Sequence, residues 1–141
     1  MLLVDANVLV HAVNQGSREH AVARDWLHGA LLGSEAVAFD WTVVLAFLRL
    51  STHPAVFPRP LSVAQAGDAM EGWLEAPPAV TIDATRQHLP LLRGLLERVG
   101  TGGNLVGDAH LAALALEHGA TVVSFDRDFA RFEGVALFRP G

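Results

Sequence analysis

The sequence predicts an α/β fold, specifically a three-layer α/β/α sandwich around a mostly parallel sheet. Short apolar segments such as residues 2–4 and 120–125 lack the polar alternation of a half-exposed strand, which is typical of strands covered on both faces. Longer segments with helical spacing of apolar residues alternate with them, and this order indicates a parallel sheet with helices packed on it. The 141 residues contain neither a linker nor a repeat, so we expect a single domain over residues 1–141.

The expected strands follow the apolar segments in chain order. Leu2-Leu3-Val4 ends in a polar turn at residues 5–7, and residues 8–10 then resume the apolar character of a strand covered on both faces. Turn-forming or acidic residues bound the later candidates. The later strands are expected at residues 36–39, 80–83, 120–125 and about 136–138.

The expected helices have apolar residues at core-facing spacing. The segment after residue 83 is helical despite Pro90, which either kinks the helix or marks its true start. Ser62 is expected to cap one helix, and Gly119 is expected to end another. The helices are expected at residues 17–32, 41–50, 63–75, 84–98 and 105–118.

Composition excludes several classes of function. The chain has no cysteine, which excludes disulfides and thiolate metal sites, and its ten basic residues are all arginine, which excludes a catalytic lysine. A net charge of −5 argues against a broad basic surface for nucleic acid, although a local arginine-lined groove beside an acidic site remains compatible with it. No apolar segment reaches the roughly 18 residues of a membrane span, and no leader is visible, so we expect a soluble, cytoplasmic protein.

The predicted helix at residues 105–118 is apolar on nearly every side, so it belongs in the interior. Asp108 lies in its first turns, where an ionised carboxylate is costly unless something cationic meets it. Asn104 is expected to cap this helix. Asp108 then either satisfies further free backbone amides at the helix start or faces a metal ion or a substrate.

Three carboxylates share one geometric property. Asp5 and Asp126 each end a predicted strand, and Asp108 opens the helix that leads into the strand carrying Asp126. If the strands are parallel, their carboxyl ends lie along one edge, where these side chains and Asp128 can converge. Clustered carboxylates cannot all stay ionised without a cation, and oxygen ligands suit Mg²⁺ or Mn²⁺ rather than zinc. Such an ion can bridge a phosphate and activate a bound water.

Each of these residues also has an ordinary structural interpretation. Asp5 can bind the backbone amides of the following turn, and Asp126 or Asp128 can cap a short helix around residues 129–132. His110 is expected to be a satisfied core or surface histidine. Most arginines are expected to be solvated, except Arg49, which interrupts an apolar helix and is placed to face the cleft.

In four segments, at residues 4–9, 41–52, 104–112 and 124–129, the sequence resembles the PIN domain, and more narrowly the VapC toxins of type II toxin–antitoxin systems in the branch abundant in mycobacteria. The resemblance covers essentially the whole chain and implies a PIN-like fold. It also implies a Mg²⁺- or Mn²⁺-dependent ribonuclease that cleaves RNA, forms a homodimer and is neutralised by a VapB antitoxin whose tail covers the acidic site. The segments are Val4-Asp5-Ala6-Asn7-Val8-Leu9, residues 41–52, residues 104–112 and Ser124-Phe125-Asp126-Arg127-Asp128-Phe129.

The resemblance also implies roles for single residues. Asp5, Asp108 and Asp126 match the metal-binding catalytic acids, and Asp128 matches a supporting acid. Asn7 matches the polar residue that orients the first aspartate, and Asn104 matches the polar residue one turn before Asp108.

One position departs from the family pattern. The usual glutamate three residues before Arg49 is replaced by Ala46, so the site lacks one acid unless Asp40 or Asp128 compensates. We expect weaker metal binding, or one well-held ion rather than two.

Two functions of different classes remain open. The first is an endoribonuclease in which a metal-activated water attacks the phosphodiester and Arg49 or Arg127 stabilises phosphate charge. The second is a catalytically silent PIN-like module that binds RNA or a partner, and Ala46 is its best support. A phosphoaspartyl protein is disfavoured because the chain has no lysine, and contact with DNA is expected only through the antitoxin.

Overall fold

Five short parallel strands form the centre of the protein in the computed structural model, which describes residues 1–141. The strand order is β3-β2-β1-β4-β5, and Leu3 of β1 pairs with Ala38 of β2 and Val122 of β4. Because all pairs are parallel, the carboxyl ends of the strands meet at one edge. The strands are β1 (Leu2–Val4), β2 (Val37–Phe39), β3 (Ala79–Thr81), β4 (Thr121–Val123) and β5 (Leu137–Phe138).

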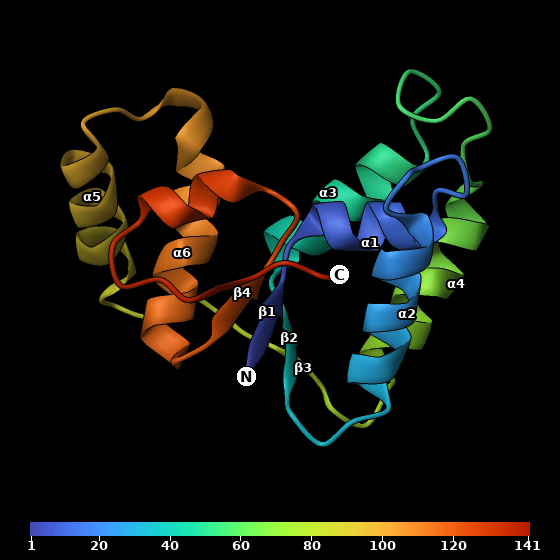
Figure 1. Cartoon of the computed structure of the whole chain (residues 1–141), viewed down its shortest axis with the longest axis horizontal. Coiled ribbons are helices and arrows are strands. Elements are labelled where there is room, and N and C mark those ends of the chain that lie inside the picture. The colour runs from blue at the N-terminus through green and yellow to red at the C-terminus, as the bar shows by residue number, and fades with distance from the viewer.

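Helices cover both faces of this sheet, with α1 to α4 on one side and α5 and α6 on the other (Figure 1). This arrangement confirms the predicted three-layer α/β/α sandwich. No helix is long and apolar enough to cross a membrane. The helices are α1 (Ala6–Val13), α2 (His20–Leu31), α3 (Trp41–Ser51), α4 (Val63–Leu74), α5 (His88–Val99) and α6 (Val106–His118), with short 3₁₀ turns η1 (Gly103–Leu105) and η2 (Arg127–Arg131).

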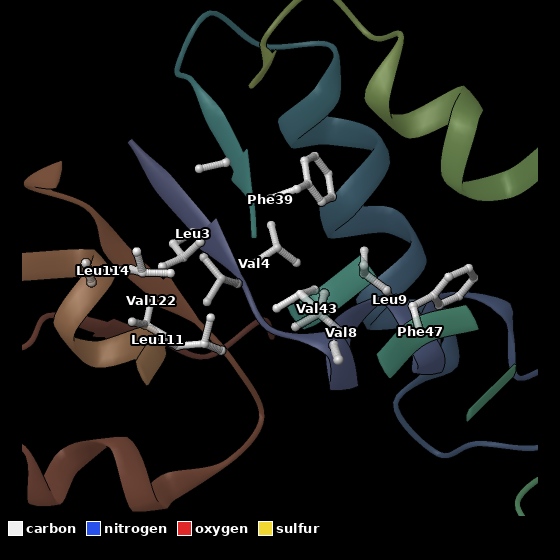
Figure 2. Packing of buried hydrophobic residues seen from close by; sticks show 14 of the residues in the cluster. Leu3, Val4, Val8, Leu9, Phe39, Val43, Phe47, Leu111, Leu114 and Val122 are labelled. Carbon is white, nitrogen blue, oxygen red and sulfur yellow. The ribbon is translucent and has the colours of Figure 1, made fainter. Parts of the chain in front are cut away.

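The core is built around β1, which lies between the two helical layers. Leu3 and Val4 are fully buried, as expected for a strand covered on both faces. Figure 2 shows Leu9 and Phe47 of the first helical layer on one side of β1 and Leu114 of α6 on the other. The all-apolar character predicted for α6 therefore reflects its position inside the molecule.

The prediction that residues 8–10 resume a strand is wrong, because they lie in helix α1. Asp5 has extended backbone angles and is the N-cap, so the helix begins at Ala6 directly after β1. Val8 and Leu9 are fully buried, and α1 packs against both α2 and α3. A short helix buried on most sides has no polar face, so periodicity cannot distinguish it from a buried strand.

The prediction that Asn104 caps α6 is also wrong. Asn104 is exposed and lies inside η1, while the N-cap position of α6 is Leu105, which makes no side-chain capping bond. The chain reaches α6 through a 3₁₀ turn that begins at Gly103, whose φ of 57° is left-handed. The first turn of α6 is consequently left without a capping side chain, and its acidic residue is Asp108.

Some other boundary predictions hold, whereas the helices expected from residues 17 and 84 begin later, at His20 and His88. Ser62 caps α4 in a reciprocal capping box with Gln65, and Gly119 ends α6 with a φ of 65°. Pro90 marks the start of its helix rather than a kink, because α5 begins at His88 and places Pro90 in the first turn, where its missing N–H costs nothing.

Candidate active site

The carboxylates singled out in the sequence lie at the carboxyl edge of the sheet. Asp5 directly follows β1, and its amide still donates to the carbonyl of Val123 in β4. Asp126 lies three residues after the end of β4, and Asp108 lies in the first turn of α6. Parallel pairing therefore brings together residues more than one hundred positions apart, as the strand pattern predicts.

Three of these carboxylates form what we call the acidic cluster: Asp108, Asp126 and Asp128. One oxygen from each lies within 4.8 Å of the others. Asp108 and Asp126 are half-buried, whereas Asp128 is exposed, so the cluster is open to solvent on one side. Asp5 is not one of the three, although it lies near enough for its charge to raise the pKa of Asp108.

Ser124 joins Asp5 to the loop that carries Asp126. Its hydroxyl donates to Asp5 Oδ2 at 2.7 Å and accepts from the amide of Asp126 at 2.9 Å. The side-chain amide of Asn7 donates to the same hydroxyl at 3.0 Å, and Asn7 Oδ1 accepts from the amide of Phe125 at 3.2 Å. Asn7 thus acts on Asp5 through Ser124, which is 1% exposed.

Sequence reasoning missed Ser124. The available signal was a small hydroxyl residue at the end of a buried strand, two positions before Asp126. Such a residue fits in a tight strand-end turn and can serve as donor and acceptor at once.

Burial and mutual repulsion perturb the acids of this edge. The pKa of Asp108 is raised to about 6, chiefly by burial and then by the charges of Asp126, Asp5 and Asp128. Burial also raises the pKa of Asp5, an effect that the hydrogen bond from Ser124 partly offsets. None of the ion pairs of the structure involves these four carboxylates. The negative charge at this edge is therefore uncompensated by the protein.

The structural alternatives for these acids are only partly realised. Asp126 does cap a short helix, because its Oδ1 accepts from the amide of Asp128 at 2.8 Å at the start of η2. Asp5 makes no capping hydrogen bond to α1, and the N-cap of α6 is Leu105 rather than Asp108. A local structural role thus accounts for one oxygen of Asp126, and Ser124 binds one oxygen of Asp5, whereas Asp108 has no hydrogen-bond partner of this kind.

The two acids considered as replacements for a glutamate at position 46 lie in different surroundings. Ala46 is half-buried and packs against the hydrophobic core. Asp40 caps α3 by accepting from the amide and hydroxyl of Thr42, and it also binds His110. Asp40 is therefore occupied by other partners, whereas Asp128 lies in the acidic cluster.

The arginines near this edge are differently placed. Arg49 and Arg127 are exposed and make no ion pair. Arg139, which sequence reasoning did not single out, donates to the carbonyl of Phe125 at 2.6 Å, and its guanidinium lies 5.2 Å from the centre of the Phe125 ring. Arg139 is the arginine held in place beside the turn that contains Ser124 and Asp126.

Comparison with known proteins gives consistent results along the whole chain. The PIN domain family matches residues 2–135. Ribonuclease VapC37 of Mycobacterium tuberculosis is 51% identical over 140 residues, which cover 99% of this chain and 97% of that protein. Ribonuclease VapC43 of the same species is 41% identical over 140 residues, covering 99% and 95% of the two chains.

Solved structures show the same fold. VapC20 of Mycobacterium tuberculosis, described as a sarcin–ricin loop cleaving toxin, aligns with a TM-score of 0.73 at 18% identity and covers 99% of this chain and 100% of that one. VapBC2 from Rickettsia felis, bound to a DNA fragment from its promoter, aligns with a TM-score of 0.72 at 19% identity, covering 99% and 98%. At these identities the structural matches establish the shared fold.

Proposed function

Because this chain belongs to the PIN-domain family and, within it, to the VapC ribonucleases, we propose that it cleaves RNA at the acidic cluster with a divalent cation bound there. The observation that carries the proposal is the convergence of Asp108, Asp126 and Asp128 within 4.8 Å without any cationic side chain paired to them. Asp5 lies at the same edge and is the further ligand that the family resemblance implies.

The residues present fit a hard divalent cation. The donor atoms are all carboxylate oxygens, which Mg²⁺ and Mn²⁺ prefer, and no cysteine exists to favour a softer metal. The raised pKa of Asp108 reflects a charge that is opposed by burial and by its neighbours, and a cation relieves both effects. We propose Mg²⁺ or Mn²⁺ as the ion, held by Asp5, Asp108 and Asp126 with Asp128 in support.

When bound, such a cation supplies Lewis-acid chemistry, because it neutralises phosphate charge and lowers the pKa of water. The residues of the protein hold the carboxylates in place. Ser124 and Asn7 fix Asp5 and the backbone of residues 125–126 in one hydrogen-bonded unit, and α6 presents Asp108 to it. The exposed side at Asp128 leaves the cluster accessible to a polymer such as RNA.

Arginine is the cation available to bind phosphate, since the chain has no lysine. Arg49 and Arg127 are exposed and make no ion pair, and we propose that they stabilise phosphate charge during cleavage. Arg139 is already held against Phe125, so it adds a fixed positive charge beside the turn of Asp126.

The VapC assignment also defines partners. We propose that the protein acts on RNA and that a VapB antitoxin neutralises it; VapBC2 from Rickettsia felis, which shares its fold, is described as bound to a DNA fragment from its promoter. We propose that this chain meets DNA only through its antitoxin, that it forms a homodimer, and that it works in the cytoplasm, where cellular RNA is available.

The test compares the wild type with Asp108→Ala on total cellular RNA at increasing Mg²⁺ or Mn²⁺. We expect fragments with defined ends from the wild type and a loss of at least about 100-fold in cleavage rate for Asp108→Ala, since the cation loses a ligand that no other side chain replaces. Asp68→Ala, which removes an exposed acid of α4, is the charge-matched control and should cleave normally.

Two results contradict the proposal. Equal cleavage by Asp108→Ala removes the acidic cluster from the mechanism. RNA binding without cleavage at every Mg²⁺ or Mn²⁺ concentration identifies a silent binding module instead, consistent with the alanine at position 46.

A further inference from the structure

A hydrogen-bonded line of four side chains lies beside the acidic cluster, and we call it the histidine network: Asp40, His110, His88 and Glu117. His110 Nε2 lies 2.8 Å from Asp40 Oδ2, His110 Nδ1 lies 2.8 Å from His88 Nε2, and His88 Nδ1 lies 2.6 Å from Glu117 Oε2. The two carboxylate ends are buried, with side chains 8% and 2% exposed. Every ring nitrogen of both histidines therefore has a partner.

The carboxylates at the two ends define the direction of these hydrogen bonds. Burial opposes the charge of Asp40, yet hydrogen bonds from His110 and Thr42 outweigh it and hold the pKa of Asp40 below its usual value. The pKa of Glu117 is lowered in the same way, because hydrogen bonds from Thr85 and His88 outweigh its burial. An ionised carboxylate only accepts, so each imidazole donates to the carboxylate at its own end of the network.

The network connects three elements that otherwise meet only through apolar contacts or backbone. Asp40 follows β2 and is level with Asp5 after β1, because Leu3 and Ala38 are paired in the sheet. His110 is two residues after Asp108 on α6, and His88 is the first residue of α5, which packs beside α6 (Figure 1). The network therefore ties the start of α6 to the edge of the sheet.

The start of α6 packs into the core through Leu105 and Ala109 but has few other polar contacts. Its N-cap, Leu105, makes no side-chain bond, and the preceding segment contains Gly100, Gly102 and Gly103, two of them with positive φ. Glycine is compatible with many backbone states, so this segment does not by itself fix the position of the helix. The bond from His110 to Asp40 is the polar contact between the first two turns of α6 and the strand edge.

We propose that His110 and Asp40 are positioning residues of the metal site, which hold Asp108 at the distance from Asp126 and Asp128 that cation binding requires. Neither side chain touches the acidic cluster, and both act through the placement of α6. This inference rests on the proposed function, because it concerns the same cation, but it also makes a claim about the protein without metal.

The experiment compares two substitutions of the same histidine. His110→Gln places an amide donor near the position of Nε2 and preserves the bond to Asp40, whereas His110→Asn reaches only the position of Nδ1 and breaks it. His118→Asn is the matched control, because His118 lies on the same helix and binds the carbonyl of Asp83 at 2.8 Å, three turns from Asp108. Mn²⁺ affinity is measured by calorimetry, and amide hydrogen exchange of residues 106–110 is measured without metal.

We expect His110→Asn to weaken Mn²⁺ binding by roughly tenfold, as loss of supporting hydrogen bonds does at other metal sites, and to speed exchange at residues 106–110. His110→Gln should keep most of the wild-type Mn²⁺ affinity and a nearly wild-type exchange rate. His118→Asn should leave both the affinity and the exchange rate unchanged. If His110→Asn does not fold, Asp40→Asn replaces it, since it keeps an oxygen for Thr42 and removes only the charge; it should show smaller changes in the same direction.

The inference is wrong if His110→Asn has the Mn²⁺ affinity and the amide hydrogen exchange of the wild type. The same result in Asp40→Asn overturns it where that variant is used. Equal effects of His110→Asn and His118→Asn also overturn it, because they indicate general loosening of α6. If the wild type binds no Mn²⁺, the proposed function fails, and the exchange of residues 106–110 alone decides whether the network positions the helix.

Discussion

The acidic cluster and the histidine network begin at the same edge of the sheet, yet the pKa values of their carboxylates shift in opposite directions although burial opposes ionisation in both. The pKa of Asp108 is raised to about 6, whereas the pKa values of Asp40 and Glu117 are lowered. The difference lies in the partners, because imidazole and hydroxyl donors meet Asp40 and Glu117, while Asp108 meets other carboxylates. The donors that meet Asp40 and Glu117 favour a structural role for these acids, whereas Asp108 has no protein donor and is available to bind a cation.

The largest change in stability is expected from Ser124→Ala. Ser124 is the neutral side chain that binds Asp5, at the same edge as the acidic cluster. The substitution leaves the buried amide of Asn7 and the amide of Asp126 without their acceptor and takes a donor from Asp5. We expect the free energy of unfolding to fall by about 2 kcal/mol in metal-free buffer, measured by urea denaturation.

Ser34→Ala, at an exposed serine outside any element, is the control for this substitution and should leave stability unchanged. A similar stability for the two variants would show that the Ser124 bonds do not hold the strand ends together.

The contrast also predicts opposite dependences of stability on pH. The folded-state pKa of Asp108 lies above the ordinary value of 3.8, so its contribution is fully present below pH 3.8 and is lost as the pH rises through about 6. The pKa of Glu117 is lowered, so its contribution is present above its usual pKa and is lost as the pH falls through the lower folded value. Neutral substitutions of Asp108 and Glu117 should therefore change the free energy of unfolding in opposite directions.

At pH 7.5 without metal, we expect Asp108→Asn to be more stable than the wild type by about 1 kcal/mol, a value already reduced for its partial exposure. Glu117→Gln should be less stable by about 1 to 2 kcal/mol, since a neutral amide has one oxygen in place of the two that accept from Thr85 and His88. Urea denaturation at pH 4 and pH 7.5 checks both, and the gain in Asp108→Asn should shrink at pH 4. Destabilisation by both substitutions at pH 7.5 would refute the distinction between the two groups of acids.

The sequence predicts this edge of the molecule well where a motif coincides with the end of a strand. Asp5 and Asp126 are recognisable because each follows an apolar segment, and parallel pairing then brings them together without further information. Residues 8–10 are predicted as a strand because α1 is only eight residues long and mostly buried, and its two polar residues, Asn7 and His11, are too few to mark a helical period. Asn104 was taken for a cap because the 3₁₀ entry at Gly103 has no simple local signature.

The histidine network could not be predicted in this way. Asp40 and His110 are 70 residues apart, and His88 and Glu117 are 29 apart, so each pair meets only after the helices have packed. The ordinary interpretation of His110 as a satisfied histidine is correct as far as it goes, since both of its nitrogens are bonded. What the sequence does not contain is the identity of those partners, which depends on how α5 and α6 lie against β2.

The smallest effect is expected at Asp128, whose substitution tests whether this exposed acid contributes to cation binding. It is exposed, so water screens its charge, but its carboxylate lies within 4.8 Å of Asp108 and Asp126. We expect Asp128→Asn to weaken Mn²⁺ binding by roughly threefold to tenfold in calorimetry, less than Asp108→Asn, because the lost ligand was never desolvated. Glu133→Gln, at another exposed acid of the same loop region, should leave the affinity unchanged. An unchanged affinity in Asp128→Asn would mean that Asp5, Asp108 and Asp126 hold the cation alone, and that the acid missing at Ala46 has no replacement.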